Sequence, residues 1–151
     1  YLPIDKFNKE DQEFKIKEII YSNNINLIVL ARYMQVLSED FAHEFEGKII
    51  NIHHSFVPSF KGAKPYHQAY ERGVKVIGAT AHYVTKDLDE GPIIEQDTQE
   101  VDHEMMPNDL VLMGRDIESR VLYRALKAHS EKRVFLNGKR TIVFKGQRVS
   151  G

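Results

Sequence analysis

The sequence contains no cysteine and no tryptophan among its 151 residues. The absence of cysteine excludes a disulfide framework, a thiolate metal site and a cysteine nucleophile. A chain that needs no disulfides fits a reducing compartment, so we expect a cytoplasmic protein.

Long apolar runs and an excess of charge of one sign are also absent. The longest apolar runs, such as "INLIVLA", are far shorter than the ~20 residues that cross a bilayer. The stretch "YLPIDKFNKEDQEF" has no basic region followed by an apolar core, so it does not resemble a secretory signal. The formal charge is −1, from 21 basic and 22 acidic residues that are mixed along the chain. We therefore expect neither a membrane nor a nucleic acid as a partner.

The first half of the chain alternates helix and strand patterns. Residues 8–24 are polar with one thin apolar face, which is typical of a surface helix. The unbroken run Leu27–Leu30 and the later "KIINIH" are predicted to be buried strands, and Ser38 and Gly47 fit the two ends of a short helix between them. This β-α-β order predicts an α/β fold in one domain, with a mainly parallel sheet flanked by helices.

Antiparallel structure is predicted to follow. Pro65 and Gly73 fit the first residue and the left-handed C-terminal cap of another helix. Residues 76–85 and 92–101 have the pattern of two antiparallel strands joined by the loop "KDLDEG".

A long helix and a hairpin complete the predicted fold. Asn108 is placed to cap the helix, whose apolar face consists of Leu110, Met113, Ile117, Val121, Leu122 and Leu126. The segment "VFLNGKRTIVF" is predicted to be a hairpin with a type I′ turn at Asn137–Gly138, which gives an antiparallel C-terminal extension.

Polar side chains cluster where the predicted strands end. Asn51 and His53 are expected at the carboxyl end of one strand, on the same face, and the loop after another strand carries Asp87, Asp89 and Glu90. An amide and an imidazole stabilise an oxyanion, and a carboxylate such as Asp89 orients or removes a proton. Because the chain has neither cysteine nor a G-x-S-x-G motif, this trio suits direct attack on a carbonyl by water or another bound nucleophile.

Each of these residues also has an ordinary structural interpretation. An Asn-x-His pair at a strand end is more often a hydrogen-bonded loop cap, Ser55 fits a turn, and His82 fits a half-buried strand histidine. A zinc site built from His53, His54, His82 and Asp89 is a further alternative. Adjacent strand residues face opposite ways, so only one of His53 and His54 is expected to reach such an ion.

The segment "NIHHSFVPSFKGAKPYHQAYERGVKVIGATAHYVTKDLDEGPIIEQD" closely resembles the core of the formyltetrahydrofolate deformylase family. Members of that family release formate from 10-formyltetrahydrofolate. The order of Asn-x-His-x-Ser, a strand and Leu-Asp-x-Gly-Pro is similar to the wider folate-dependent formyltransferase superfamily. The resemblance extends from Leu27 to Phe144 and implies a formyltransferase-like, Rossmann-related fold.

The resemblance implies that Asn51, His53 and Asp89 surround the formyl group as catalytic residues. It also implies that the pterin lies against "LARYMQVL" and "HYVTKDLD". The implied folate contacts come from Leu30, Val36, Leu37, Val84 and Thr85. His54 and His82 are further candidates for the site. The folate is then the substrate, and neither a cofactor nor a metal is implied.

The residue after His53 and the loop that follows it favour a hydrolase over a transferase. Glycinamide ribonucleotide formyltransferases typically have proline after the histidine and a "YPG"-like loop, whereas this chain has His54 and "FKGAKPYHQAYERG". Two alternatives stay open, namely a glycinamide ribonucleotide formyltransferase and a folate-binding module without activity.

The resemblance also bears on domain organisation. A complete deformylase resembles a regulatory ACT domain followed by the hydrolase domain. Residues 1–151 are therefore expected to be the C-terminal portion of a single formyltransferase-like catalytic domain, without the ACT domain and the first strands of the catalytic domain. A sheet with one uncovered flank exposes apolar surface, so we expect a homo-oligomer.

Overall fold

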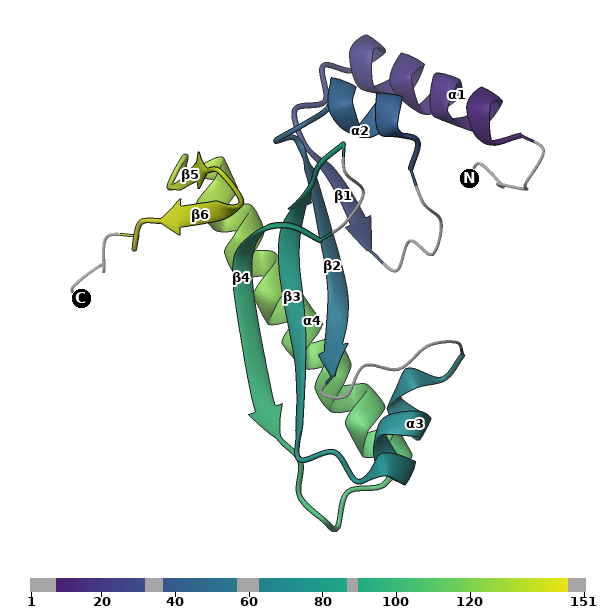
Figure 1. Ribbon diagram of the computed structural model, residues 1–151, viewed down its shortest axis with the longest axis vertical. Coiled ribbons are helices and arrows are strands. Elements are labelled where there is room, and N and C mark those ends of the chain that lie inside the picture. The colour runs from purple at the N-terminus through teal and green to yellow at the C-terminus, as the bar shows by residue number, and fades with distance from the viewer. Residues whose placement is uncertain (1–7, 32–36, 57–62, 87–89, 147–151) are drawn as a thin grey trace.

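The computed structural model describes residues 8–31, 37–56, 63–86 and 90–146, which form a four-stranded sheet, four helices and a separate hairpin (Figure 1). The sheet has the order β1 (Ile28–Ala31), β2 (Ile49–Phe56), β3 (Val76–Val84), β4 (Glu90–Glu100). The helices are α1 (Lys9–Ser22), α2 (Glu39–Glu44), α3 (Pro65–Arg72) and α4 (Pro107–Ser130). The hairpin pairs β5 (Val134–Asn137) with β6 (Arg140–Val143). Within the described ranges, no helix is long and apolar enough to cross a membrane.

The sheet is mixed, so the prediction of a mainly parallel sheet is wrong for this part of the chain. β1 and β2 are parallel, whereas β2–β3 and β3–β4 are antiparallel. The chain enters β3 from the end at which β2 stops, as Figure 1 shows. The eight residues of α3 rise only about 12 Å, against about 26 Å for the eight residues of β2, so this helix does not itself return the chain to the start of β2.

β1 is only half-buried, although its apolar run predicted burial on both faces. Its residues alternate between partly buried and exposed, and Val29 is 38% exposed. Among the described strands β1 pairs with β2 alone, so it forms an edge of the sheet.

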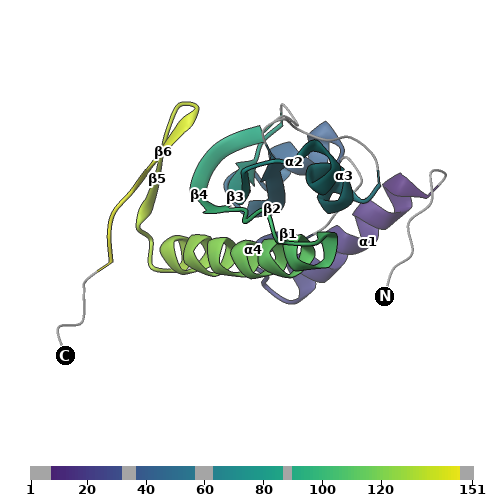
Figure 2. The same ribbon diagram turned by 90° about the horizontal axis from the view of Figure 1, so that it is seen from below.

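One face of the sheet is covered by α4, which lies across the strands (Figure 2). Ile50, Ile52 and Ile77 of the sheet pack in one cluster with Ile117 and Val121 of the helix. The predicted apolar face of this helix is confirmed, because each of its six residues is buried or partly buried.

The predicted start of this long helix was two residues late. Pro107 is its first residue and Met106 is its N-terminal cap, so Asn108 lies inside the first turn. The carboxylate of Asp109 accepts a hydrogen bond from the backbone N–H of Met106 at 2.8 Å, and Asp109 therefore does the capping that was expected of Asn108.

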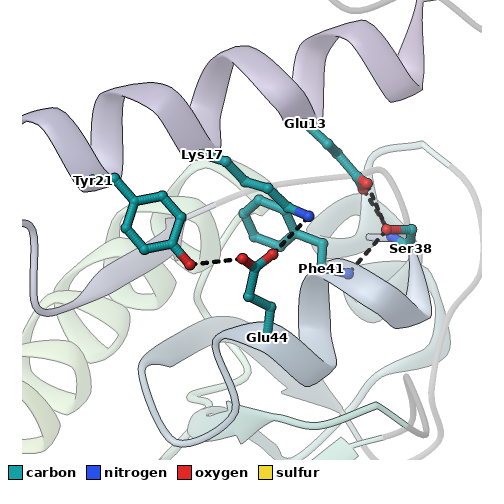
Figure 3. A network of polar contacts seen from close by, with 6 residues as sticks. All are labelled: Glu13, Lys17, Tyr21, Ser38, Phe41 and Glu44. Carbon is teal, nitrogen blue, oxygen red and sulfur yellow. Dashed lines mark hydrogen bonds and ion pairs between the residues drawn. The ribbon is translucent and has the colours of Figure 1, made fainter.

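α1 and α2 pack together at the end of the sheet where β2 begins (Figure 1). Glu13 is 9% exposed, and its carboxylate accepts hydrogen bonds from the backbone N–H of Ser38 at 2.8 Å and from the Ser38 hydroxyl at 2.5 Å (Figure 3). The Ser38 hydroxyl oxygen in turn accepts from the N–H of Phe41, which confirms Ser38 as the cap of α2.

A second pair of contacts joins the same two helices. The ammonium of Lys17 and the hydroxyl of Tyr21 each lie 2.6 Å from a different oxygen of the Glu44 carboxylate (Figure 3). The hydrogen bond from Lys17, followed by that from Tyr21, lowers the pKa of Glu44, and the bond to Glu44 raises the pKa of Tyr21. These groups are partly exposed, so the ion pair orients the helices more than it stabilises them.

Two predicted turns have different outcomes. Gly73 has φ +63° and ψ +42° after Arg72, so the predicted left-handed cap of α3 is confirmed. In the hairpin, Asn137 pairs with Arg140, so the central residues are Gly138 and Lys139, and only Gly138 has positive φ. This is the pattern of a type II′ turn, and the type I′ prediction is wrong because the strand continues one residue further than expected.

A partly buried pair, Tyr83 and His129, joins β3 to the last turn of α4. The hydroxyl of Tyr83 lies 2.7 Å from Nδ1 of His129, and their rings meet edge to face. Burial raises the pKa of Tyr83 and lowers the pKa of His129. The tyrosine hydroxyl therefore donates to a neutral imidazole in the folded protein.

The lowered pKa of His129 predicts a loss of stability in acid. Below about pH 6.5 the unfolded chain takes up a proton at His129 that the folded protein still refuses, so the free energy of unfolding falls as the pH falls. His129→Gln should make the urea midpoint less sensitive to pH between about 7.5 and 5.5. His67→Gln, at an exposed histidine of α3, is the control and should leave that sensitivity unchanged. If the urea midpoints of the wild type and His129→Gln depended equally on pH, His129 would not be the source of the loss of stability in acid.

Candidate active site

Asn51 and His53 lie on β2 and face away from α4. Ile50 and Ile52 alternate with them and pack in the core against that helix, so the period of two in a strand puts Asn51 and His53 on the other face. The prediction that they share a face agrees with the pairing of Asn51 with His82 and of His53 with Thr80.

The position of this pair along the strand differs from the prediction. β2 was expected to stop at His53, but its pairing with β3 continues to Phe56 opposite Ile77. Asn51 and His53 therefore lie inside β2 rather than at its carboxyl end. Asn51 pairs with both β1 and β3, and His53, one residue beyond the last β1 pair, pairs with β3. A side chain on such a strand is held more rigidly than one on a loop, which suits a preorganised hydrogen-bond donor.

His82 joins this pair from the neighbouring strand. It is 4% exposed, and its ring meets the His53 ring edge to face at a centroid distance of 5.2 Å. Nδ1 of His82 lies 2.8 Å from the carbonyl oxygen of Tyr83 and 3.3 Å from the backbone N of Gly91. These two contacts need opposite tautomers, and the shorter one favours an Nδ1–H that donates to Tyr83 and leaves Nε2 as an acceptor. His82 is thus a satisfied strand histidine, as its ordinary interpretation predicted, and it also contacts His53.

A row of hydrogen bonds extends the same face across three strands. The hydroxyls of Ser55 and Thr80 are 2.7 Å apart, and the side-chain amide of Gln96 donates to Thr80 at 2.9 Å. We call Ser55, Thr80 and Gln96 the hydroxyl row. Ser55 lies on a strand opposite Gly78, so its interpretation as a turn residue is wrong.

The hydroxyl row was missed in the sequence, although a signal was there. Every second residue of "NIHHSF" from Asn51, and of "GATAH" from Gly78, is polar or is a glycine. Alternation of this kind marks one polar face of a sheet. Only the register shows that the two series lie opposite one another.

His54 points to the opposite side of the sheet. Its Nδ1 lies 3.7 Å from a carboxylate oxygen of Glu118 on α4, and its ring packs near Phe56 and Tyr66. His54 therefore does not converge with His53 and His82. This confirms the prediction, made from the strand period, that His53 and His54 face opposite ways. Among the described residues, no group of three or more histidine or acidic side chains is placed to hold a metal ion.

The residues with implied folate contacts lie next to Asn51, toward the end of the sheet where α1 and α2 pack: Leu30 is the β1 partner of Asn51, and Val84 lies two residues after His82 on β3. Leu30, Leu37 and Val84 belong to the apolar cluster beneath α1 and α2. Leu37 and Val84 are only 5% and 8% exposed, so their side chains are part of the core, whereas Thr85 is partly exposed. Val36 and the predicted catalytic Asp89 lie outside the described residues, and their roles stay predictions.

Comparison with known proteins identifies the fold and the family. A family model described as formyl transferase matches residues 5–126. The chain belongs to the formyl transferase family. Its sheet and helices superpose on a formyltetrahydrofolate deformylase from Burkholderia mallei with a TM-score of 0.90 at 55% identity, over 96% of this chain and 52% of that one. A phosphoribosylglycinamide formyltransferase from Anaplasma phagocytophilum superposes with a TM-score of 0.78 at 32% identity, over 90% of this chain and 67% of that one.

Curated relatives in the formyl transferase family agree with the predicted resemblance. The chain is 59% identical to a formyltetrahydrofolate deformylase of Corynebacterium sp. (strain P-1) over 96% of its own length and 51% of the relative. It is 54% identical to a formyltetrahydrofolate deformylase of Bacillus subtilis (strain 168), over 95% of this chain and 48% of the relative. The chain thus spans about half the length of the curated relatives it matches, and the predicted resemblance to deformylases is confirmed.

The β3–β4 junction beside His82 predicts a strong effect of a small substitution. A Cβ added at Gly91 would lie 1.9 Å from the carbonyl oxygen of Tyr83, which is the acceptor for His82. Gly91→Ala should lower the free energy of unfolding by about 3 kcal/mol, because backbone must move to relieve the overlap. Urea denaturation measures this change.

The matched control is Gly146→Ala. The nearest atoms to an added Cβ at Gly146 are side-chain atoms at 3.5–3.7 Å, which is ordinary van der Waals contact. The control should change the free energy of unfolding by no more than about 0.5 kcal/mol. Equal stability of the two variants would show that Gly91 is not held against Tyr83.

Proposed function

We propose that the protein containing this chain hydrolyses 10-formyltetrahydrofolate to tetrahydrofolate and formate, and so supplies formate to one-carbon metabolism and purine synthesis. The observation that carries the proposal is the difference in identity between two groups of relatives. The chain is 49–55% identical to three solved deformylases, but only 28–34% identical to solved glycinamide ribonucleotide formyltransferases of similar fold.

Asn51 and His53 are suited to the charge that develops in this reaction. When water adds to the formyl carbon, the formyl oxygen becomes an oxyanion. The Asn51 amide and a protonated His53 are proposed to donate hydrogen bonds to it from the rigid face of β2. The contact between His53 and the buried ring of His82 restricts the orientation of the His53 imidazole.

Proton transfer completes the proposed mechanism. Asp89 accepts the proton that the attacking water loses. The bond between the formyl carbon and the folate nitrogen then breaks, and His53 delivers a proton to that nitrogen. Formate and tetrahydrofolate leave, and no metal takes part in these steps.

The folate is proposed to lie near the segment 30–37 and the end of β3. Because Leu37 and Val84 are buried, their backbone groups and the partly exposed Leu30 and Thr85 are the proposed contacts. Val36 is a further proposed contact. The buried side chains would then support that surface from below.

We also propose a cytoplasmic homo-oligomer. The absence of cysteine supports the compartment. The exposed apolar side chains of the hairpin and the residue after it, which include Phe135, Leu136 and Phe144, support self-association.

A glycinamide ribonucleotide formyltransferase is the second candidate, because the same fold is found in those enzymes. The deciding experiment measures formate release from 10-formyltetrahydrofolate by the full-length protein, with and without glycinamide ribonucleotide. We expect release without an amine acceptor, at a rate that the acceptor does not change. Formyl transfer that requires the acceptor would establish the transferase, and folate binding without either product would indicate a module without activity.

Asp89→Asn tests the carboxylate. The variant should lower kcat for formate release by about 100-fold or more, because the water loses its proton acceptor, while folate binding stays close to that of the wild type. Asp116→Asn removes an exposed carboxylate of α4 and should keep full activity. Near-normal turnover of Asp89→Asn would remove Asp89 from the mechanism.

A further inference from the structure

The hydroxyl row lies directly beside the proposed catalytic pair. Thr80 is the β3 partner of His53, and its hydroxyl links Ser55 on β2 to Gln96 on β4. The row therefore spans the three strands next to each other in Figure 1, on the face that carries Asn51.

The hydrogen bonds of the row have a direction. The Gln96 amide donates to the Thr80 oxygen, and Thr80 is only 2% exposed, so the proton of Thr80 needs an acceptor inside the protein. The Ser55 oxygen, 2.7 Å away, is the acceptor that the described residues provide. Thr80 therefore donates to Ser55, and the proton of Ser55 points away from Thr80.

The Ser55 proton is available to a ligand. Ser55 is only partly buried, and the described part of the chain records no acceptor for its proton. Each hydrogen bond in a chain polarises the next, so two donors behind Ser55 strengthen it as a donor.

Strand geometry separates the targets of Asn51 and Ser55. The two residues are four apart on β2, so their Cα atoms are about 13 Å apart, and His53 lies midway between them. An asparagine and a serine at that separation cannot both bond to one oxygen atom. If Asn51 binds the formyl oxygen, Ser55 must bind a different oxygen, and the side chain of His53 can reach toward either.

We propose that Ser55 is a catalytic residue that donates a hydrogen bond to the attacking water beside His53, with Thr80 and Gln96 as positioning residues. This inference rests on the proposed hydrolysis. One lone pair of the water accepts the Ser55 proton, and the other forms the bond to the formyl carbon. The water proton leaves to Asp89, and the folate nitrogen departs with a proton from His53 as described above.

Alanine and threonine at position 55 test the donor. Ser55→Ala should lower kcat for formate release by about tenfold in the full-length protein, which corresponds to one lost hydrogen bond, and should leave KM for 10-formyltetrahydrofolate unchanged. Ser55→Thr keeps a hydroxyl and should recover most of the rate.

Hydroxylamine provides a readout that a structural role would not change. It competes with water for the formyl group and gives formohydroxamate in place of formate. If Ser55 holds the water, Ser55→Ala should lower formate production more than formohydroxamate production, so the ratio of formohydroxamate to formate should rise by about tenfold. General damage to the site would lower both products equally and leave the ratio unchanged.

Valine substitutions at two threonines test the relay. Thr80→Val preserves shape but breaks the row, and should shift the product ratio in the same direction as Ser55→Ala but by less. Thr98→Val changes an exposed threonine of β4 that lies opposite Gly78, and should leave kcat and the ratio unchanged.

The outcomes separate the two proposals. A wild type that releases formate, together with a Ser55→Ala variant of normal kcat or unchanged product ratio, would overturn the role of Ser55 alone. A wild type that releases no formate from 10-formyltetrahydrofolate would overturn the proposed hydrolysis and, with it, this inference.

Discussion

The register between β2 and β3 is the constraint on which the rest of the structure depends. It pairs Ile50 with Tyr83 and Phe56 with Ile77, so these apolar residues face α4 while Asn51, His53 and Ser55 face the other way. A shift of one residue would turn Asn51 and His53 into the core and expose the isoleucines. The burial of the core against α4 therefore fixes the register that presents the polar face. The same packing that forms the core thus also places Asn51 and His53 on the face opposite α4.

The polar face combines donors with different degrees of rigidity. Asn51, His53 and Ser55 share a strand that pairs with β3 along nearly its whole length, and Thr80 and His82 approach from β3 with almost no exposure. Preorganised donors of this kind do not have to be reoriented as charge develops, which is the main electrostatic advantage of a protein over water. The proposed carboxylate comes from the β3–β4 connection instead. Two residues after this carboxylate in the sequence, Gly91 lets the backbone of β4 lie directly against Tyr83.

Different helices pack against the sheet at one end and along one face: α1 and α2 pack at the end where β2 begins, and α4 packs along a face. At one end, Glu13 and Ser38 hold α2 against α1, and this contact lies next to Leu37 in the proposed folate-binding segment. Along the opposite face, α4 covers the strands from β2 to β4. The polar face between these supports carries side chains that neither helix needs for packing, which explains how it can be devoted to a ligand.

Local patterns in the sequence determined the elements and the identities of the candidate groups. Pro65 and Gly73 delimited α3, Ser38 capped α2, and the apolar positions from Leu110 to Leu126 defined the face of α4, because each signal acts within one or two turns of the chain. The Asn-x-His pair was found from the sequence, and the period of two correctly separated His53 from His54.

Only the tertiary structure decided how these elements run and which side chains meet. The antiparallel direction of β3 is set by its pairing with β2, and the half-exposure of β1 depends on its place at the sheet edge. The hydroxyl row joins Ser55, Thr80 and Gln96, which are 25 and 16 residues apart along the chain. No local pattern specifies such contacts, because they arise from the register between strands, and that register is set by the burial of the whole apolar face.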